Sequence, residues 1–137
     1  QGYLQALHER DYTVEEGLTA VGDFTEIGGR TAMQRLLPQQ PDAVFVASDT
    51  MAQGAMQVIT SAGLAVPQDI ALIGYDDLPP AAQSTPPLTT IRQPVKRAGY
   101  TAVETLLDIL AHGSQPPRRI ILPTELVIRQ SCGTARP

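Results

Sequence analysis

The sequence predicts an α/β fold in which a parallel sheet carries helices on both faces. Short apolar runs alternate with helical patterns up to residue 75, as is typical of strands joined by crossover helices. Two of the runs, residues 42–47 and 70–75, are continuously apolar, which indicates strands buried on both faces. The 137 residues, 42% of them hydrophobic, suffice for one domain with a hydrophobic core.

The first third of the chain predicts a helix, a short strand and a second helix. Residues 2–10 carry apolar side chains at helical spacing, and residues 17–22 form a weak strand pattern. Thr25 is a suitable N-cap for the second helix, which Pro38 ends. Its apolar face consists of Ala32, Met33, Leu36 and Leu37.

The middle of the chain predicts a strand, a helix and another strand. The strand at 42–47 leads into cap-type residues at 48–50, and Gly63 is placed to end the helix that follows. After the strand at 70–75, residues 76–87 contain four prolines and are expected to form a loop.

The last third keeps the same elements in a weaker alternation. Residues 88–91 predict a short strand, and the next segment predicts an amphipathic helix that ends at His112–Gly113. Residues 119–122 and 125–131 are expected to be closing strands. The change of pattern after residue 75 suggests that the proline-rich loop marks a crossing into another lobe.

Charge and composition exclude several classes of protein. The net charge of −4 leaves no basic footprint for nucleic acid in this chain. Cys132 is the sole cysteine and cannot form an internal disulfide, which favours a reducing, cytoplasmic location. No apolar run approaches the length of a membrane span, so no membrane partner is expected.

Polar residues follow each of the first three predicted strands. Open α/β sheets bind ligands beyond the carboxyl ends of their strands, where this chain has Asp23–Phe24, Ser48–Asp49 and Asp76–Asp77. An ionised carboxylate can accept two hydroxyl protons, and a ring can stack on a sugar or a heterocycle. We expect one aspartate of the last pair to bind a ligand.

Each of these residues also has a structural interpretation. Asp49 fits a helix N-terminus as an acid that satisfies free N–H groups, and Ser48 can simply cap the same helix. Asp77 can form an Asx-turn, whereas Phe24 can be a hydrophobic staple for its own helix. The two histidines, His8 and His112, lie at predicted helix ends, where a structural or solvated role is expected.

Enzyme and metal signatures are missing from the sequence. It has no G-x-S-x-G, H-E-x-x-H, C-x-x-C, Walker or G-x-G-x-x-G motif. Adjacent carboxylates such as Asp76 and Asp77 do not flank a sugar from opposite sides, as glycoside hydrolysis requires. We therefore expect no enzyme, no metal site and no cofactor.

Three motifs occur in order between residues 42 and 94, "ASDTMAQGAM", "VPQDIALIGYDD" and "PPLTTIRQP", and a fourth segment, "LPTELVIRQSCG", follows. Together they resemble the effector-binding domain of the LacI/GalR family of bacterial transcriptional repressors. This resemblance implies a periplasmic-binding-protein-like type I fold with a small effector in a cleft between two lobes. Residues 1–88 and 124–137 would lie mainly in the C-terminal lobe, with 92–122 crossing into the other.

The resemblance also implies roles for individual residues. Phe24 falls where the family stacks an aromatic ring on the effector, and Ser48 falls where many members have an effector-binding Asn. Asp76 matches the carboxylate that fixes the effector, and Gln93 lies at the hinge strand within reach of it. Asp77 falls outside the cleft contacts.

A homodimer is a further implication. On the helix that begins at Ser48, one stripe must face the sheet, which leaves Gln53, Met56 and Gln57 on another face. In the family, this helix and the proline-rich loop form the dimer contact, so Pro80 and Ser84 are added to the expected two-fold interface.

The expected function is effector sensing in a LacI-type regulator, with a sugar as the first choice of effector and a purine-like metabolite as the second. Because the helix-turn-helix of the family is missing from this sequence, operator DNA would be bound only through a segment outside it. The sequence is thus expected to be a fragment of one domain. The alternative is a periplasmic sugar-binding protein of a transporter.

Overall fold

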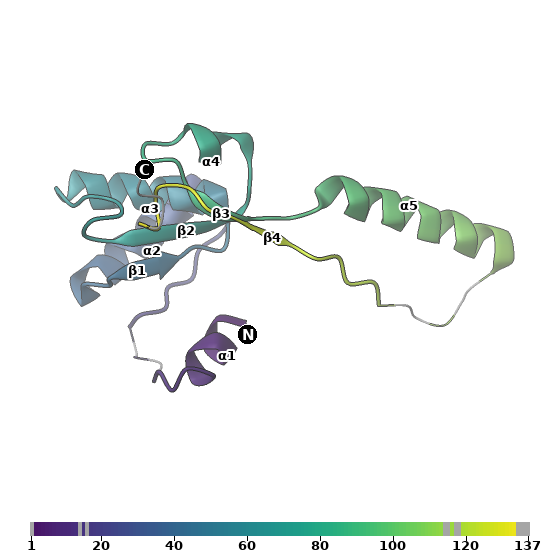
Figure 1. Ribbon diagram of the computed structural model, residues 1–137, viewed down its shortest axis with the longest axis horizontal. Coiled ribbons are helices and arrows are strands. Elements are labelled where there is room, and N and C mark those ends of the chain that lie inside the picture. Colours follow the sequence, from purple (N-terminus) through teal and green to yellow (C-terminus); the bar gives the residue numbers. More distant parts are fainter. Residues whose placement is uncertain (1, 14, 16, 114–115, 117–118, 134–137) are drawn as a thin grey trace.

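A computed structural model describes the chain except residues 1, 14, 16, 114–115, 117–118 and 134–137 (Figure 1). Its elements follow the order α1 (Gly2–His8), α2 (Glu26–Leu36), the 3-10 helix η1 (Leu37–Gln39), β1 (Ala43–Phe45), α3 (Asp49–Ser61), β2 (Ala71–Asp76), α4 (Pro79–Gln83), β3 (Thr89–Arg92), α5 (Val95–His112) and β4 (Glu125–Val127). The predicted α/β class is confirmed.

The sheet has the strand order β1-β2-β3-β4. The first three strands are parallel, with Val44 opposite Leu72 and Ile73 opposite Thr89. β4 is antiparallel to β3, and Leu126 lies opposite Ile91. The carboxyl ends of β1, β2 and β3 therefore share one edge, where the candidate ligand residues Ser48, Asp76 and Gln93 lie.

Helices α2 and α3 cross closely because each has a glycine at the crossing. A Cβ on Gly29 would collide with the backbone of Met51, and a Cβ on Gly54 would collide with the carbonyl oxygen of Glu26. The close approach lets both helices contribute to one core over the sheet. Its larger members are Met33, Met56, Ile59, Ile70, Leu72 and Leu88.

The opposite face of β1 is not covered by the described residues. Val44 is buried, but Phe45, which points to the other side of the strand, is 50% exposed. The prediction that residues 42–47 are buried on both faces is therefore wrong for this chain. A continuous apolar run indicates that both faces of a strand can be buried. It does not indicate whether this chain contains the residues that bury the second face.

Three predicted strands differ from the structure. Residues 17–22 lie outside the sheet, with Val21 exposed, and residues 119–122 form no strand either. The predicted strand at 125–131 is shortened to β4 because the chain turns inward at Ser131. This serine bridges the amino ends of two strands: its Oγ donates to the carbonyl of Leu72 (2.6 Å) and accepts from the N–H of Thr89 (2.8 Å).

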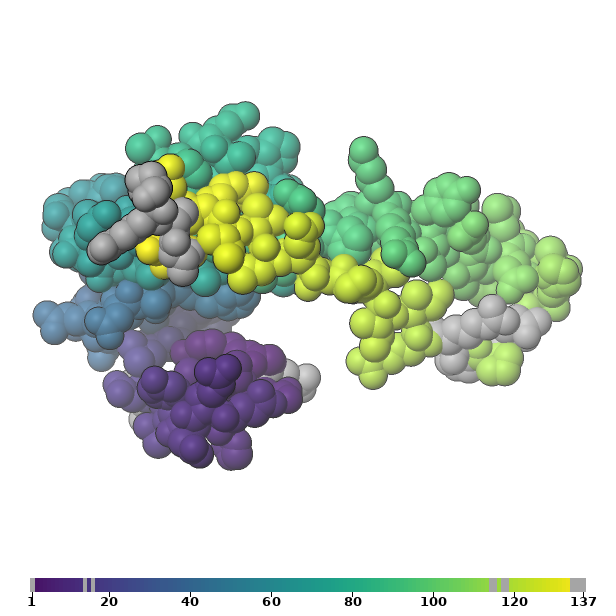
Figure 2. All heavy atoms as spheres, viewed as in Figure 1, coloured from purple at the N-terminus to yellow at the C-terminus, as the bar shows by residue number. Residues whose placement is uncertain are grey.

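Helix α5 extends away from the sheet, and the segment after it returns toward β4 (Figures 1 and 2). No residue of α5 is buried, although the predicted apolar stripe is present. Its exposed apolar side chains include Val103, Leu106, Leu107, Ile109 and Leu110. Among the described residues, no helix combines the length and the apolarity needed to cross a membrane.

Candidate functional site

The carboxyl edge of the parallel strands brings Asp76 and Gln93 into direct contact. Asp76 is the last residue of β2, and Gln93 directly follows β3. The Gln93 amide Nε2 donates to Asp76 Oδ1 at 2.6 Å, and both side chains are half-buried. Among the described residues, the second oxygen of Asp76 has no hydrogen-bond partner. A carboxylate held by one oxygen can still accept a ligand hydroxyl or N–H at the other.

Asp77, in contrast, is fully engaged inside the protein. Its Oδ1 accepts from Arg129 Nη2 at 2.6 Å, and its Oδ2 accepts from Arg92 Nε at 2.7 Å. Burial would raise the pKa of Asp77, but the hydrogen bonds and charges of the two arginines outweigh it and hold the pKa below its usual value. Asp77 thus ties the end of β2 to β3 and to the chain after β4.

Phe24 presents its ring to solvent. It is 67% exposed, and its φ of 64° lies in the left-handed region. A staple would pair it with the fourth residue of α2, which is Gly29 and has no side chain to meet it. The preceding Asp23 accepts from the Thr25 hydroxyl, and this bond lowers the pKa of the Asp23 carboxyl.

Left-handed backbone conformations gather at the candidate site. Phe24 (φ 64°), Asp76 (116°) and Asp77 (57°) are three of the five non-glycine residues with positive φ in the described chain. Such conformations are unfavourable for residues with a Cβ and persist where the surroundings impose them, often at ligand sites. No sequence pattern signals them, because glycine or asparagine would be the residue expected there.

Ser48 caps α3, as its structural interpretation predicts. The side chain is buried, and its Oγ accepts from the N–H of Met51 at 3.2 Å. The cap places Ser48 at the end of the loop that follows β1, on the same edge as Asp76. Its contact with an effector stays a prediction.

Asp49 begins α3, as predicted, but the sequence did not predict the contacts of its carboxylate. Only 1% of it is exposed, and its carboxylate reaches across to β3 and to the loop after β2. Oδ1 accepts from the Thr90 hydroxyl at 2.6 Å and Oδ2 from the N–H of Leu78 at 2.8 Å. Desolvation raises the pKa of Asp49; these two hydrogen bonds oppose the shift, and the charges of Asp76 and Asp77 add to it.

The structure changes the argument for the dimer interface. Met56 is 5% exposed and belongs to the core of its own chain, so the expectation that it lies on an open face is wrong. The reason is that Met56 belongs to the same buried cluster as Ala81 of α4 and Leu88, on the side of α3 away from the α2 crossing at Gly54. Pro80 is exposed, whereas Gln53 and Ser84 are half-buried. The interface itself stays a prediction.

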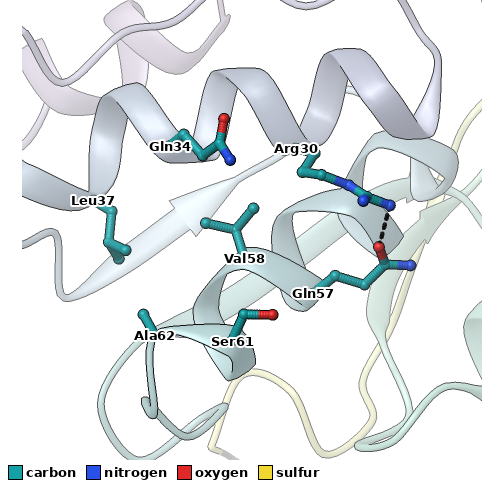
Figure 3. Close-up of a pocket in the computed structure, with 7 residues that line it drawn as sticks. All are labelled: Arg30, Gln34, Leu37, Gln57, Val58, Ser61 and Ala62. Atoms are coloured by element: carbon teal, nitrogen blue, oxygen red, sulfur yellow. Dashed lines mark hydrogen bonds between the residues drawn. The ribbon is translucent and has the colours of Figure 1, made fainter.

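A hollow between α2 and α3 includes Gln57, another predicted interface residue (Figure 3). Arg30 Nη2 donates to Gln57 Oε1, and Gln57 Nε2 donates to Glu26 Oε1 at 2.8 Å. Its other lining residues are Gln34, Leu37, Val58, Ser61 and Ala62. Gln57 therefore binds α2 of its own chain, and the hollow contains none of the four predicted effector residues.

Metal binding finds no support in the part of the chain that the structure describes, where no group of three or more His, Cys, Asp or Glu side chains could hold an ion. His112 pairs with Asp108 on the surface of α5, and His8 is exposed.

A family model described as a periplasmic binding protein-like domain matches residues 1–132. The chain therefore belongs to the periplasmic binding protein-like domains. Its relatives place it among the effector-binding domains of LacI-type transcriptional regulators, which confirms the resemblance seen in the sequence.

Three of these relatives illustrate the similarity. The HTH-type transcriptional repressor PurR of Edwardsiella ictaluri (strain 93-146) is 44% identical over 133 residues, 96% of this chain and 39% of PurR. The transcriptional regulator CelR–cellobiose complex superposes with a TM-score of 0.92 at 38% identity, over 96% of this chain and 41% of that one. A LacI-family regulatory protein from Chloroflexus aggregans gives 0.86 at 36% identity, over 97% and 49%.

The chain spans about two fifths of the length of the curated relatives that it matches, since it covers 39% of PurR. These relatives are named as transcriptional regulators, in agreement with the prediction that the chain is not an enzyme.

Proposed function

We propose that this chain is the ligand-sensing part of a LacI-type transcriptional regulator and binds a small polar effector at the carboxyl edge of its sheet. The observation that carries the proposal is the pair Asp76–Gln93, whose carboxylate keeps one oxygen without a partner among the residues that the structure describes. The exposed ring of Phe24 lies in the loop before α2, and this loop is held against α3 through Gly22 and Met51.

A sugar is the first choice of effector and a purine-like metabolite is the second. A solved relative, CelR, is in complex with cellobiose, which supports the first choice. A carboxylate that accepts two hydroxyl protons and a ring that covers an apolar sugar face suit a disaccharide. The same two groups suit a purine, whose N–H groups and flat ring make equivalent contacts. Ser48 adds a hydroxyl at the same edge.

The position of Gln93 suggests how binding is sensed. It lies between β3, which belongs to the sheet, and α5, which extends away from it (Figure 1). We propose that residues 1–88 and 124–137, as far as the structure describes them, lie mainly in one lobe and that the described part of 92–122 crosses into a second. An effector that bonds Asp76 and Gln93 together would favour one interlobe arrangement, and so shift the population of DNA-binding states.

The regulator we propose is a cytoplasmic homodimer that binds operator DNA through a segment outside this sequence. Pro80 and Ser84 of the α4 region are the interface residues on which this dimer now depends most. Sedimentation of the full-length gene product, with Pro80→Asp as the variant, tests the dimer: a mass unchanged by this substitution would place the interface elsewhere.

The alternative function is that of a periplasmic sugar-binding protein. It is supported by the family model, which describes a periplasmic binding protein-like domain. The sequence that precedes residue 1 in the gene distinguishes the two. A helix-turn-helix would establish the regulator, and a signal peptide the transport protein.

Calorimetric titration of the full-length gene product with cellobiose and with guanine tests the site. Asp76→Ala removes a charge-assisted hydrogen bond and leaves a donor group of the ligand without an acceptor. The affinity should therefore fall by about 1.5–3 kcal/mol, or roughly 10- to 150-fold. Asp77→Asn is the control, because its carboxylate is occupied by arginines. Equal losses of affinity in the two variants would refute the assignment of Asp76.

A further inference from the structure

The buried carboxylate of Asp49 accepts hydrogen bonds that hold the end of β2, where Asp76 lies. Asp49, the first residue of α3, accepts the N–H of Leu78 at 2.8 Å through Oδ2. Through Oδ1 it accepts the hydroxyl of Thr90 at 2.6 Å. The Thr90 oxygen in turn receives the N–H of Asp77 at 3.4 Å, a long contact. One side chain thus satisfies the backbone after Asp76 both directly and through Thr90.

These hydrogen bonds explain how an unfavourable backbone conformation is maintained at Asp76 and Asp77. Asp76 and Asp77 both have positive φ, and such conformations last only where neighbouring contacts fix them. The contacts to Asp49 fix the two residues that follow, and Gln93 fixes the side chain of Asp76 from β3. Without the N–H bond to Leu78, the chain could return to an ordinary conformation that turns the Asp76 carboxylate away.

The neighbourhood of Asp49 leaves it no alternative role. It is almost completely buried, so it cannot reach a ligand in solvent, and the capping bond of α3 is made by Ser48 instead. A Cβ at Gly74 would collide with the Asp49 carboxylate, so the glycine of β2 provides the space in which this side chain lies.

We propose that Asp49 is a positioning residue for effector binding: with Thr90, it holds residues 76–78 in the conformation that directs Asp76 toward the ligand. This inference rests on the proposed function. It assigns to Asp49 a part in effector affinity that goes beyond its place at a helix N-terminus.

Two substitutions weaken the hydrogen bonds between Asp49, Thr90 and residues 77–78 without creating a cavity. Asp49→Asn keeps the shape but removes the charge and leaves one acceptor oxygen, so the charge-assisted bond to the N–H of Leu78 becomes a weaker neutral one and the Thr90 hydroxyl loses its acceptor. Thr90→Val removes only the relay hydroxyl and keeps the direct bond to Leu78. Asp69→Asn is the matched control, because Asp69 Oδ2 also accepts a backbone N–H, that of Ala65 at 2.7 Å, in the turn before β2.

Amide hydrogen exchange in the full-length gene product is the first measurement. Asp49→Asn should accelerate exchange at Leu78 at least tenfold, Thr90→Val should do so at Asp77, and Asp69→Asn should change neither. A change spread evenly over the protein would mean that Asp49 acts on global stability, and would overturn the proposal.

Effector affinity is the second measurement, made with cellobiose and guanine as probes. Asp49→Asn should weaken binding about tenfold in the wild type and by less than twofold in an Asp76→Asn background, because its effect passes through Asp76. Equal losses in both backgrounds would overturn the proposal. If Asp76→Asn itself leaves the affinity of both probes unchanged, the proposed function fails at this site, and amide exchange alone decides whether Asp49 holds the strand end.

Discussion

The sheet region and helix α5 are both amphipathic in sequence, yet they differ completely in burial. Around the sheet, Leu72 and Leu88 are fully buried beneath α2, α3 and α4. Helix α5 has an equally clear apolar stripe and buries none of its residues. The same pattern therefore produces a packed core in one region and an open apolar surface in the other.

The difference shows what hydrophobic periodicity can and cannot specify. It defines which side of a helix is to be covered, because an apolar stripe in water costs free energy. It does not define which segment provides the cover. In the proposed architecture, α5 belongs to a second lobe, and the exposed stripe is the surface that this lobe would bury.

The largest expected effect compares one leucine from each region. Leu88→Ala empties part of a core in which Leu88 is 0% exposed, and should lower the free energy of unfolding of this chain by about 3 kcal/mol. Leu110→Ala on α5 changes a side chain that is 73% exposed, and should cost less than about 0.5 kcal/mol. Urea unfolding of the 137-residue chain measures both.

The same pair in the full-length gene product sharpens the comparison. If a second lobe covers α5, Leu110→Ala should there cost about 2 kcal/mol or more, in the range of a core truncation. An equally small cost in both proteins would show that the α5 stripe is not buried by the rest of the gene product.

A smaller effect is expected from the ion pairs of the two regions. Asp77→Asn should cost about 2 kcal/mol at pH 7, because Asp77 is largely buried between Arg92 and Arg129. Its native pKa lies below the ordinary 3.8, so this contribution is present above pH 3.8 and is lost as the pH falls through the native pKa. Urea unfolding between pH 7 and pH 3 measures the difference from the wild type, which should shrink below pH 3.8.

Asp108→Asn on α5 provides the contrast for that titration. Asp108 pairs with His112, and both side chains are well exposed, so the variant should differ from the wild type by less than about 0.5 kcal/mol at pH 7. A pH-independent difference for Asp77→Asn would mean that its arginine pairs do not set its contribution.

Much of the sheet region could be predicted from local patterns. The helix α3, its cap Ser48 and the strands near residues 43–45, 71–76 and 89–92 follow from periodicity and capping rules. The segments at 17–22 and 119–122 were predicted as strands because their residue types favour an extended backbone. A strand also requires a neighbouring strand to pair with, and these segments have none in the described sheet.

The contacts that shape the candidate site could not be predicted in the same way. Asp77 meets Arg129, and Asp49 meets Thr90, over long separations in the chain that leave no local periodicity. The resemblance to LacI-type domains indicated that Asp76 and Asp77 differ in role. The physical reason for the difference, two arginines on one carboxylate and a single glutamine on the other, appears only in three dimensions.

The smallest expected effect concerns the strain at Phe24, an exposed ring on a left-handed backbone. If the ring serves a ligand and not the core, Phe24→Gly should stabilise the unliganded chain by about 0.5–1 kcal/mol, since glycine adopts a φ of 64° without steric cost. Phe24→Ala keeps the strained backbone, so its stability should match the wild type. Urea unfolding measures both, and titration of the full-length gene product with cellobiose should show the same loss of affinity for the two variants. A lower free energy of unfolding for both variants would show that Phe24 packs within the protein, and the ring would then not belong to the proposed site.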